Sequence, residues 1–151
     1  MSIAVVDSGG ANISSVMHAL KRLGAEPVFT ADAGAIRSAD RVILPGVGAA
    51  GRAMQVLEQH DLVSVIRSLR QPVLGVCLGM QLLFESSEED GAALLGLIPA
   101  RLTRIPQRKG LRIPHMGWNA IENLQANELT SGLDGKWFYF VHSYAAPTGA
   151  W

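Results

Sequence analysis

Short runs rich in β-branched residues alternate along the first half of the chain with longer segments of helical period. Such alternation favours parallel strands, because a parallel pair needs a long crossover connection, usually a helix, on one face of its sheet. The sequence therefore predicts an α/β fold with a doubly wound, mainly parallel sheet and helices on both faces. The predicted strands are residues 3–7, 28–30, 41–44 and 72–76.

Segments with helical spacing lie between these strands. The first ends at Gly24, a residue suited to a left-handed helix cap. Its apolar residues are Ile13, Val16, Met17, Leu20 and Leu23. Further helices are expected near residues 32–37, 50–57 and 61–69. After Glu89 the pattern weakens into a loop-rich stretch that carries Pro99, Pro106 and Pro114, before a last strand at residues 137–141.

Length and composition limit the classes of protein to consider. With 151 residues, 48% of them hydrophobic, and no internal repeat or linker, one domain spanning residues 1–151 is expected. Thirteen basic residues balance thirteen acidic ones, which gives no overall field for nucleic acid or an anionic membrane. The longest apolar runs are far shorter than a membrane span and the N-terminus lacks a secretion signal, so a cytoplasmic protein is expected.

The single cysteine, Cys77, excludes an internal disulfide and is either a buried core residue or a reactive thiol. The strand at residues 72–76 meets a Gly-x-Cys-x-Gly turn, formed with Gly75 and Gly79, and a helical pattern then begins. This spacing is typical of a nucleophile elbow, in which small residues let the backbone turn tightly and lift the nucleophile clear of the sheet. A helix N-terminus would also favour the thiolate. The alternative is a glycine-bounded turn with a buried cysteine.

A cysteine that attacks an amide carbonyl needs hydrogen-bond donors for the developing oxyanion. The backbone amide of Leu78, directly after the cysteine, is one candidate. A second donor is expected from the loop at residues 45–48, which leaves the strand at residues 41–44 at its carboxyl end. Parallel sheets place their binding sites at that end.

A rival interpretation of the same loop is dinucleotide binding. Gly46, Gly48 and Gly51 match the Gly-x-Gly-x-x-Gly pattern after a strand. That pattern also requires an acidic residue about twenty positions further on for the ribose hydroxyls. This chain has Ile66 there, inside a helical segment, which disfavours nicotinamide or flavin binding.

Several segments resemble the class I, or triad, glutamine amidotransferases. The oxyanion and elbow segments that carry this resemblance are Pro45-Gly46-Val47-Gly48 and Gly75-Val76-Cys77-Leu78-Gly79-Met80-Gln81. Three more resemble the branch of the family that serves histidine biosynthesis: Val5-Val6-Asp7-Ser8-Gly9-Gly10-Ala11-Asn12, Pro114-His115-Met116-Gly117-Trp118-Asn119 and Phe138-Tyr139-Phe140-Val141-His142-Ser143-Tyr144. The resemblance runs from end to end of the chain and implies a flavodoxin-like sheet.

The resemblance implies a glutaminase reaction. Cys77 would attack the side-chain amide of glutamine, form a thioester and release ammonia, after which water frees glutamate. The backbone amides of Val47 and Leu78 would bind the oxyanion. The residues implied to hold glutamine are Gly48, Gln81, Ser143 and Tyr144, the last two mainly through backbone, with Glu89 at the substrate ammonium. No cofactor and no metal are implied.

The resemblance also implies a partner. Ammonia would pass to a (β/α)₈-barrel cyclase subunit, in a heterodimer, and react there with a phosphorylated ribulosyl-aminoimidazole intermediate. Trp118 beside Met116 is typical of an interface anchor, and packing of Trp118 in the core is the alternative. The residues implied to face the cyclase are Asn12, Trp118, Asn119, Trp137 and Tyr139.

Two further sets of residues are assigned no chemistry. A basic stretch is expected to be a solvated loop rather than a nucleic-acid site, because Ile105, Pro106 and Gly110 break any helical stripe. Its members are Arg101, Arg104, Arg108, Lys109 and Arg112. His18 and His60 lie in helical segments without a second ligand at metal spacing.

The family pattern includes a His-x-Glu pair downstream of the Phe-Val-His-Ser-Tyr strand, on which the cysteine relies. None of the four histidines in these 151 residues is followed by that pattern. The resemblance therefore leads us to expect a form shortened at its C-terminus that turns over poorly alone. Two other classes stay open: a glutamine-binding or cyclase-binding module without turnover, and a cysteine hydrolase of the same fold with another acyl substrate.

Overall fold

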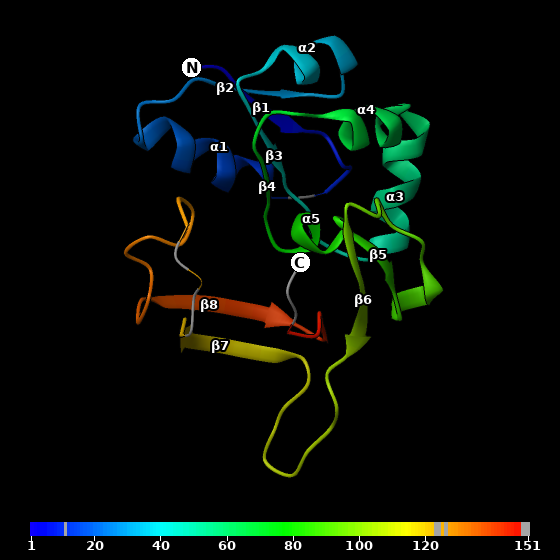
Figure 1. Ribbon diagram of the computed structural model, residues 1–151, viewed down its shortest axis with the longest axis vertical. Coiled ribbons are helices and arrows are strands. Elements are labelled where there is room, and N and C mark those ends of the chain that lie inside the picture. The colour runs from blue at the N-terminus through cyan, green and yellow to red at the C-terminus, as the bar shows by residue number, and fades with distance from the viewer. Residues whose placement is uncertain (11, 123–124, 126, 149–151) are drawn as a thin grey trace. The chain divides into compact units, whose positions relative to one another are not determined.

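The computed structural model describes residues 1–10, 12–122, 125 and 127–148. Contacts along the chain divide it into two compact units (Figure 1). The first unit is Met1–Thr103 with Ala146–Trp151, and the second is Arg104–Ala145. The single domain expected over residues 1–151 stays a prediction.

The first unit contains the predicted parallel sheet. Its strands, in spatial order, are β2 (Pro27–Thr30), β1 (Ile3–Val6), β3 (Arg41–Leu44) and β4 (Val73–Gly75). All neighbours are parallel, with Ile3 paired to both Pro27 and Arg41, and Val42 paired to Val73. A first strand lying between the second and the third is the flavodoxin-like order, which confirms the predicted fold class.

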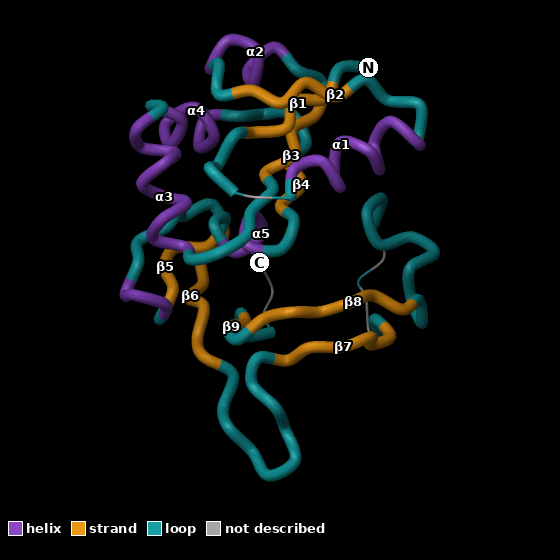
Figure 2. The backbone as a smooth tube through the Cα atoms, turned by 180° about the vertical axis from the view of Figure 1, so that it is seen from behind, coloured by secondary structure: helices purple, strands orange, loops and turns teal. Residues whose placement is uncertain are grey.

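Helices cover both faces of this sheet (Figure 2). α1 (Ile13–Arg22) lies on one face, and α2 (Ala33–Ser38), α3 (Ala50–Gln59) and α4 (Leu62–Ser68) lie on the other. Side chains of a strand alternate between its faces. Ile3 and Val5 pack against α1, and Ala4 and Val6 therefore face the other helices.

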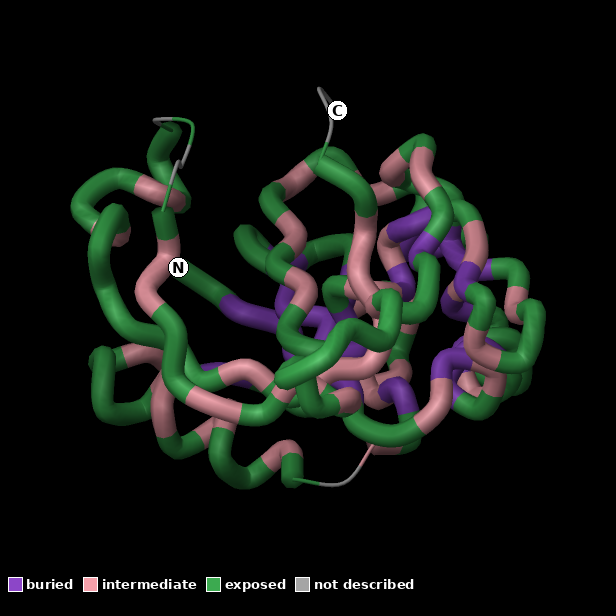
Figure 3. The backbone as a smooth tube through the Cα atoms, turned by 90° about the horizontal axis from the view of Figure 1, so that it is seen from below, coloured by how far each residue is buried: buried purple, intermediate pink, exposed green. Residues whose placement is uncertain are grey.

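The core is concentrated in the first unit. Among the described residues, every side chain that is almost fully buried belongs to it (Figure 3). On the face opposite α1, Ile36, Leu57 and Ile66 from the three covering helices are completely or almost completely buried. Within the part of the chain that the structure describes, no helix is both long and apolar enough to cross a membrane.

Two strands follow the elbow helix α5 (Leu78–Gln81). They are β5 (Phe84–Ser87) and β6 (Ile98–Arg104), which pair in parallel, with the short 3₁₀ helix η1 (Glu89–Gly91) between them. The prediction of a loop-rich stretch after Glu89 is therefore wrong for β6. Its half-buried or buried Ile98, Ala100 and Leu102 do alternate with exposed residues, but Pro99 hides the period. Arg101 and Arg104, expected in a solvated loop, lie exposed on this strand.

The second unit is built on an antiparallel pair, β7 (His115–Ala120) and β8 (Trp137–His142), followed by the short β9 (Tyr144–Ala145). The register pairs His115 with His142 and Ala120 with Trp137. β8 confirms the strand predicted at residues 137–141, although it is not the last one, since β9 follows it. β7 lies in the stretch predicted to be loop, because its apolar residues are broken by Gly117 and Asn119.

Asp40 ties the beginning of β3 to the beginning of β1. Its carboxylate accepts hydrogen bonds from the backbone N–H and the hydroxyl of Ser2, and its own N–H donates to the Ser2 hydroxyl. The Ser2 N–H, and after it the Ser2 hydroxyl, lower the pKa of Asp40 below its usual 3.8. A pKa lowered in the folded state means that the carboxylate stabilises the fold above the unfolded pKa, and that this stabilisation is lost as pH falls through the folded pKa.

We expect Asp40→Asn to lower the Tm at neutral pH and to have a smaller effect in acid, where the native carboxyl is itself protonated. Thermal melts of both proteins over a range of pH measure this. Asp134→Asn, a change at an exposed carboxylate in the second unit, is the matched control. A Tm difference that stays the same into strong acid would contradict the role given to the Asp40 charge.

Candidate active site

Cys77 lies in a tight turn between β4 and α5. Its φ of 54° and ψ of −118° are sparsely populated by residues other than glycine, and such a conformation costs on the order of 1–3 kcal/mol. Backbone hydrogen bonds hold the turn on both sides: the Gly79 N–H donates to Val76 O and the Met80 N–H donates to Cys77 O, both at 3.0 Å. Cys77 is exposed, so the alternative of a buried cysteine is wrong.

The two glycines of the turn are required by close backbone approaches. A Cβ added to Gly79 would lie 1.8 Å from the carbonyl oxygen of Leu44, at the end of β3. A Cβ added to Gly75 would lie 2.4 Å from the Cα of Met80. Real side chains do not tolerate such distances, so both positions accept glycine only. The geometry is that of a nucleophile elbow.

The loop at residues 45–48 packs against this elbow. A Cβ added to Gly46 would lie 2.9 Å from the Gly79 nitrogen, which places the loop and the start of α5 in backbone contact. Val47 is half-exposed, Leu78 is buried, and Gly48 has a φ of 96°. The two segments expected to supply the oxyanion donors are thus adjacent in the first unit.

Two side chains hold the ends of this loop. The buried hydroxyl of Ser8 donates to Pro45 O at 2.8 Å. At the other end, the half-buried carboxylate of Glu89 accepts from the Ala50 N–H at 2.9 Å, at the N-terminus of α3. Ser8 was not among the predicted site residues, although its place directly after the first predicted strand puts it at the same edge of the sheet. Glu89 was expected at the substrate ammonium, and this remains a prediction for its second oxygen.

The other predicted substrate residues lie on both units. Gln81 is half-buried at the end of α5, where its N–H donates to Cys77 O at 3.2 Å. In the second unit, Ser143 lies between β8 and β9, Tyr144 begins β9, and both are half-buried. Ser143 O accepts from the Ile105 N–H at 2.9 Å.

One face of the β7–β8 pair exposes large apolar side chains, and we call it the docking face. Trp118 is 63% exposed and Tyr139, its cross-strand partner, 54% exposed, with ring centroids 5.6 Å apart in an edge-on arrangement. The members of the docking face are Met116, Trp118, Trp137, Tyr139 and Val141. Core packing of Trp118 is excluded by its exposure. Asn119 points with His115 to the other face, and Asn12 occupies the N-cap position of α1 in the first unit.

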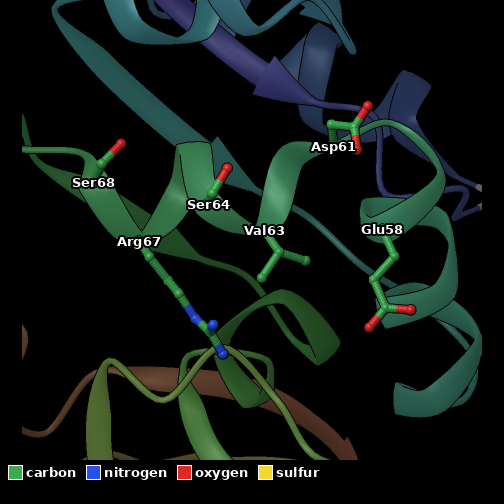
Figure 4. A pocket seen from close by; sticks show the side chains of 6 residues that line it. All are labelled: Glu58, Asp61, Val63, Ser64, Arg67 and Ser68. Atoms are coloured by element: carbon green, nitrogen blue, oxygen red, sulfur yellow. The ribbon is translucent and has the colours of Figure 1, made fainter.

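A hollow of about 530 Å³ lies beside the end of α3 and along α4 (Figure 4). It is lined by Glu58, Asp61, Val63, Ser64, Arg67 and Ser68, none of which was predicted to be functional. The Arg67 guanidinium points out of it and donates to Leu95 O at 2.8 Å and to Leu94 O at 3.2 Å. Arg67 therefore serves to attach α4 to the chain before β6.

Comparison with known proteins agrees with this geometry. The family model described as glutamine amidotransferase class-I matches residues 4–149. A protein of Xylella fastidiosa (strain Temecula1 / ATCC 700964), named imidazole glycerol phosphate synthase subunit HisH, is 49% identical over 96% of this chain and 73% of its own length. The protein of the same name from Yersinia pestis is 48% identical over 97% of this chain and 76% of its own length.

A solved structure described as a crystal structure of glutamine amidotransferase has the same fold. Its TM-score is 0.74 over 97% of this chain and 74% of the solved chain, at 17% sequence identity. The match of the family model over nearly the whole chain, and the identity to the two relatives, establish membership. The chain belongs to the class-I glutamine amidotransferase family.

Proposed function

We propose that this chain hydrolyses glutamine to glutamate and ammonia through Cys77, as the glutaminase subunit of an imidazole glycerol phosphate synthase in histidine biosynthesis. The observation that carries the proposal is the strained, exposed Cys77 in a glycine-bounded elbow, beside the loop at residues 45–48. The names of the relatives support the choice of glutamine and of the synthase.

The reaction has two covalent steps. The Cys77 sulfur attacks the carboxamide carbon, the Val47 and Leu78 amides bind the oxyanion, and the C–N bond breaks as ammonia leaves with an added proton. Water then attacks the thioester carbon, the C–S bond breaks, and glutamate and the thiol are released. The His-x-Glu pair expected from the resemblance would move the protons. None of the four histidines carries that pattern, and the ring nitrogens of His142 bond Tyr144 O and His115 Nδ1.

In the first unit, the groups proposed to hold glutamine are Gly48, Gln81 and Glu89. The resemblance adds the backbone of Ser143 and Tyr144, which lie in the second unit. Glu89 is suited to an ammonium group, because one carboxylate oxygen is fixed by the Ala50 N–H and the carboxylate keeps further acceptor sites. Such a fixed carboxylate would select an amino-acid substrate over a simple amide.

The proposed partner is a (β/α)₈-barrel cyclase subunit in a heterodimer in the cytoplasm. Exposed aromatic residues are enriched at protein interfaces, and the docking face presents two Trp and one Tyr on one side of a hairpin. Trp118, Trp137 and Tyr139 would contact the cyclase there, with Asn119 and Asn12 at further contacts.

Cys77→Ala should abolish the release of ammonia from glutamine. The change removes the nucleophile and little volume, and alanine meets the same backbone strain as cysteine, so the fold should be kept. Glutamate formation with the cyclase present measures activity, and circular dichroism measures folding. Ser64→Ala on α4 is the matched control, since it removes an exposed hydroxyl away from the elbow.

Retained glutaminase activity in Cys77→Ala would sink the proposed mechanism. A diazo-ketone analogue of glutamine should label Cys77 in the wild-type protein. Cleavage of a general ester, without labelling by the analogue, would instead point to a cysteine hydrolase with another acyl substrate.

Trp118→Ala should weaken binding of the cyclase by at least about 1 kcal/mol, the usual threshold for an interface residue that matters. Truncation removes an anchor that is 63% exposed in this chain and would become buried in the complex. Isothermal titration gives the Kd. Leu129→Ala is the control, because Leu129 is 65% exposed and lies outside the docking face. Equal Kd values for the two variants would show that Trp118 does not contribute to binding of the cyclase.

A further inference from the structure

The face of the β7–β8 pair opposite the docking face carries a continuous row of hydrogen-bonding groups. His142 Nδ1 lies 2.8 Å from Tyr144 O, and His142 Nε2 lies 3.1 Å from His115 Nδ1. His115 Nε2 lies 3.0 Å from Asn119 Oδ1. The row runs from the backbone of β9 across both strands of the hairpin, entirely within the second unit.

The donor and acceptor of each hydrogen bond in this row follow from the group at its end. A backbone carbonyl only accepts, so the bond to Tyr144 O requires a proton on His142 Nδ1. In a neutral imidazole the other nitrogen then carries the lone pair. His142 Nε2 therefore accepts, and His115 Nδ1 donates to it. If both rings are neutral, His115 Nε2 carries a lone pair and requires the NH₂ group of Asn119 in the place now given to Oδ1, an amide orientation that is assigned from such a network.

The bond from His142 fixes a peptide plane of the proposed substrate segment. A trans peptide is planar, with its C=O and N–H pointing in opposite directions. The Ile105 N–H, bonded to Ser143 O, thus orients the Tyr144 N–H, and His142 Nδ1, bonded to Tyr144 O, orients the next N–H along the chain. Two successive peptide planes after His142 are held in this way.

The far end of the row lies on β7, one of the two strands that carry the docking face. Side chains alternate along a strand, so His115 and Asn119 lie on one face of β7 while Met116 and Trp118 lie on the other. A partner that moves β7 along or across β8 would change the separation of His115 and His142. The hydrogen bond at Tyr144 O would respond, because His115 Nδ1–H, by donating to His142 Nε2, acts together with Tyr144 O to keep the His142 proton on Nδ1.

We propose that His142 is a positioning residue for glutamine, that His115 fixes its tautomer, and that the pair links the docking face to the substrate segment. This inference rests on the proposed function, in which the backbone of Ser143 and Tyr144 binds glutamine. The rings of His115 and His142 also contact Phe140, at centroid distances of 5.7 and 6.0 Å. Packing and hydrogen bonding must therefore be separated by the choice of variants.

His142→Phe keeps a ring of similar size and removes both hydrogen bonds, whereas His142→Asn keeps a donor near the position of Nδ1. In the complex with the cyclase, His142→Phe should raise the KM for glutamine about three- to tenfold, the range for loss of one hydrogen bond. His142→Asn should restore most of the wild-type KM. Phe140→Leu, which changes the packing alone, should leave the KM near that of wild type.

Nitrogen-15 NMR of the imidazoles supplies a readout that packing would not move. The wild-type chain should show His142 as a single Nδ1–H tautomer, and His115→Phe should convert it to a mixture of tautomers. Two kinetic results would overturn the inference: an active wild type with the same KM as His142→Phe, or a His142→Asn variant as impaired as His142→Phe. An unchanged His142 tautomer in His115→Phe would also overturn it. A wild-type complex that neither forms glutamate from glutamine nor is labelled at Cys77 by the diazo-ketone analogue would instead overturn the proposed function, and the inference with it.

Discussion

The candidate site depends on one approach between two stretches of backbone, where α5 begins against the end of β3. Leu44 O accepts the Val76 N–H at 3.0 Å, and the same oxygen lies where a Cβ of Gly79 would be. The carbonyl thus completes the hydrogen bonding between β3 and β4, and its position excludes a side chain at residue 79. Because Cys77 lies between Val76 and Gly79, pairing of the sheet sets its position, and no contact of its own side chain is needed.

The loop at residues 45–48, beside the elbow, is also held by hydrogen bonds to groups outside it. Ser8 holds Pro45 O from the end of β1, and Glu89 holds the Ala50 N–H from the segment after β5. Oxyanion donors stabilise a transition state best when they need no rearrangement as charge develops. Tethers at both ends of a glycine-containing loop limit such rearrangement while leaving Val47 half-exposed. If Glu89 also meets the substrate ammonium, binding of glutamine would tighten one of these tethers.

The sequence predicted those features that follow from short-range patterns. The four parallel strands, the covering helices and the elbow depend on apolar period and on glycine spacing, and the observed ends lie close to those predicted. β6 and β7 were missed because a proline, a glycine and polar residues interrupt strands whose pairing is decided by distant partners. The roles of Ser8 and of the His115–His142 pair depend on contacts 37 and 27 residues apart, which no local pattern contains. The helical pattern expected after Cys77 yields only the four residues of α5.

At Cys77, the proposed nucleophile, folding stability and the proposed catalysis favour different residues. Only glycine occupies a φ of 54° with a ψ of −118° without strain, so the residue best for folding at this position is one with no sulfur. Laboratory evolution that selects for thermal stability alone would accumulate Cys77→Gly and yield more stable proteins without the proposed nucleophile. Selection for ammonia production would keep the cysteine and recover the lost stability elsewhere in the core.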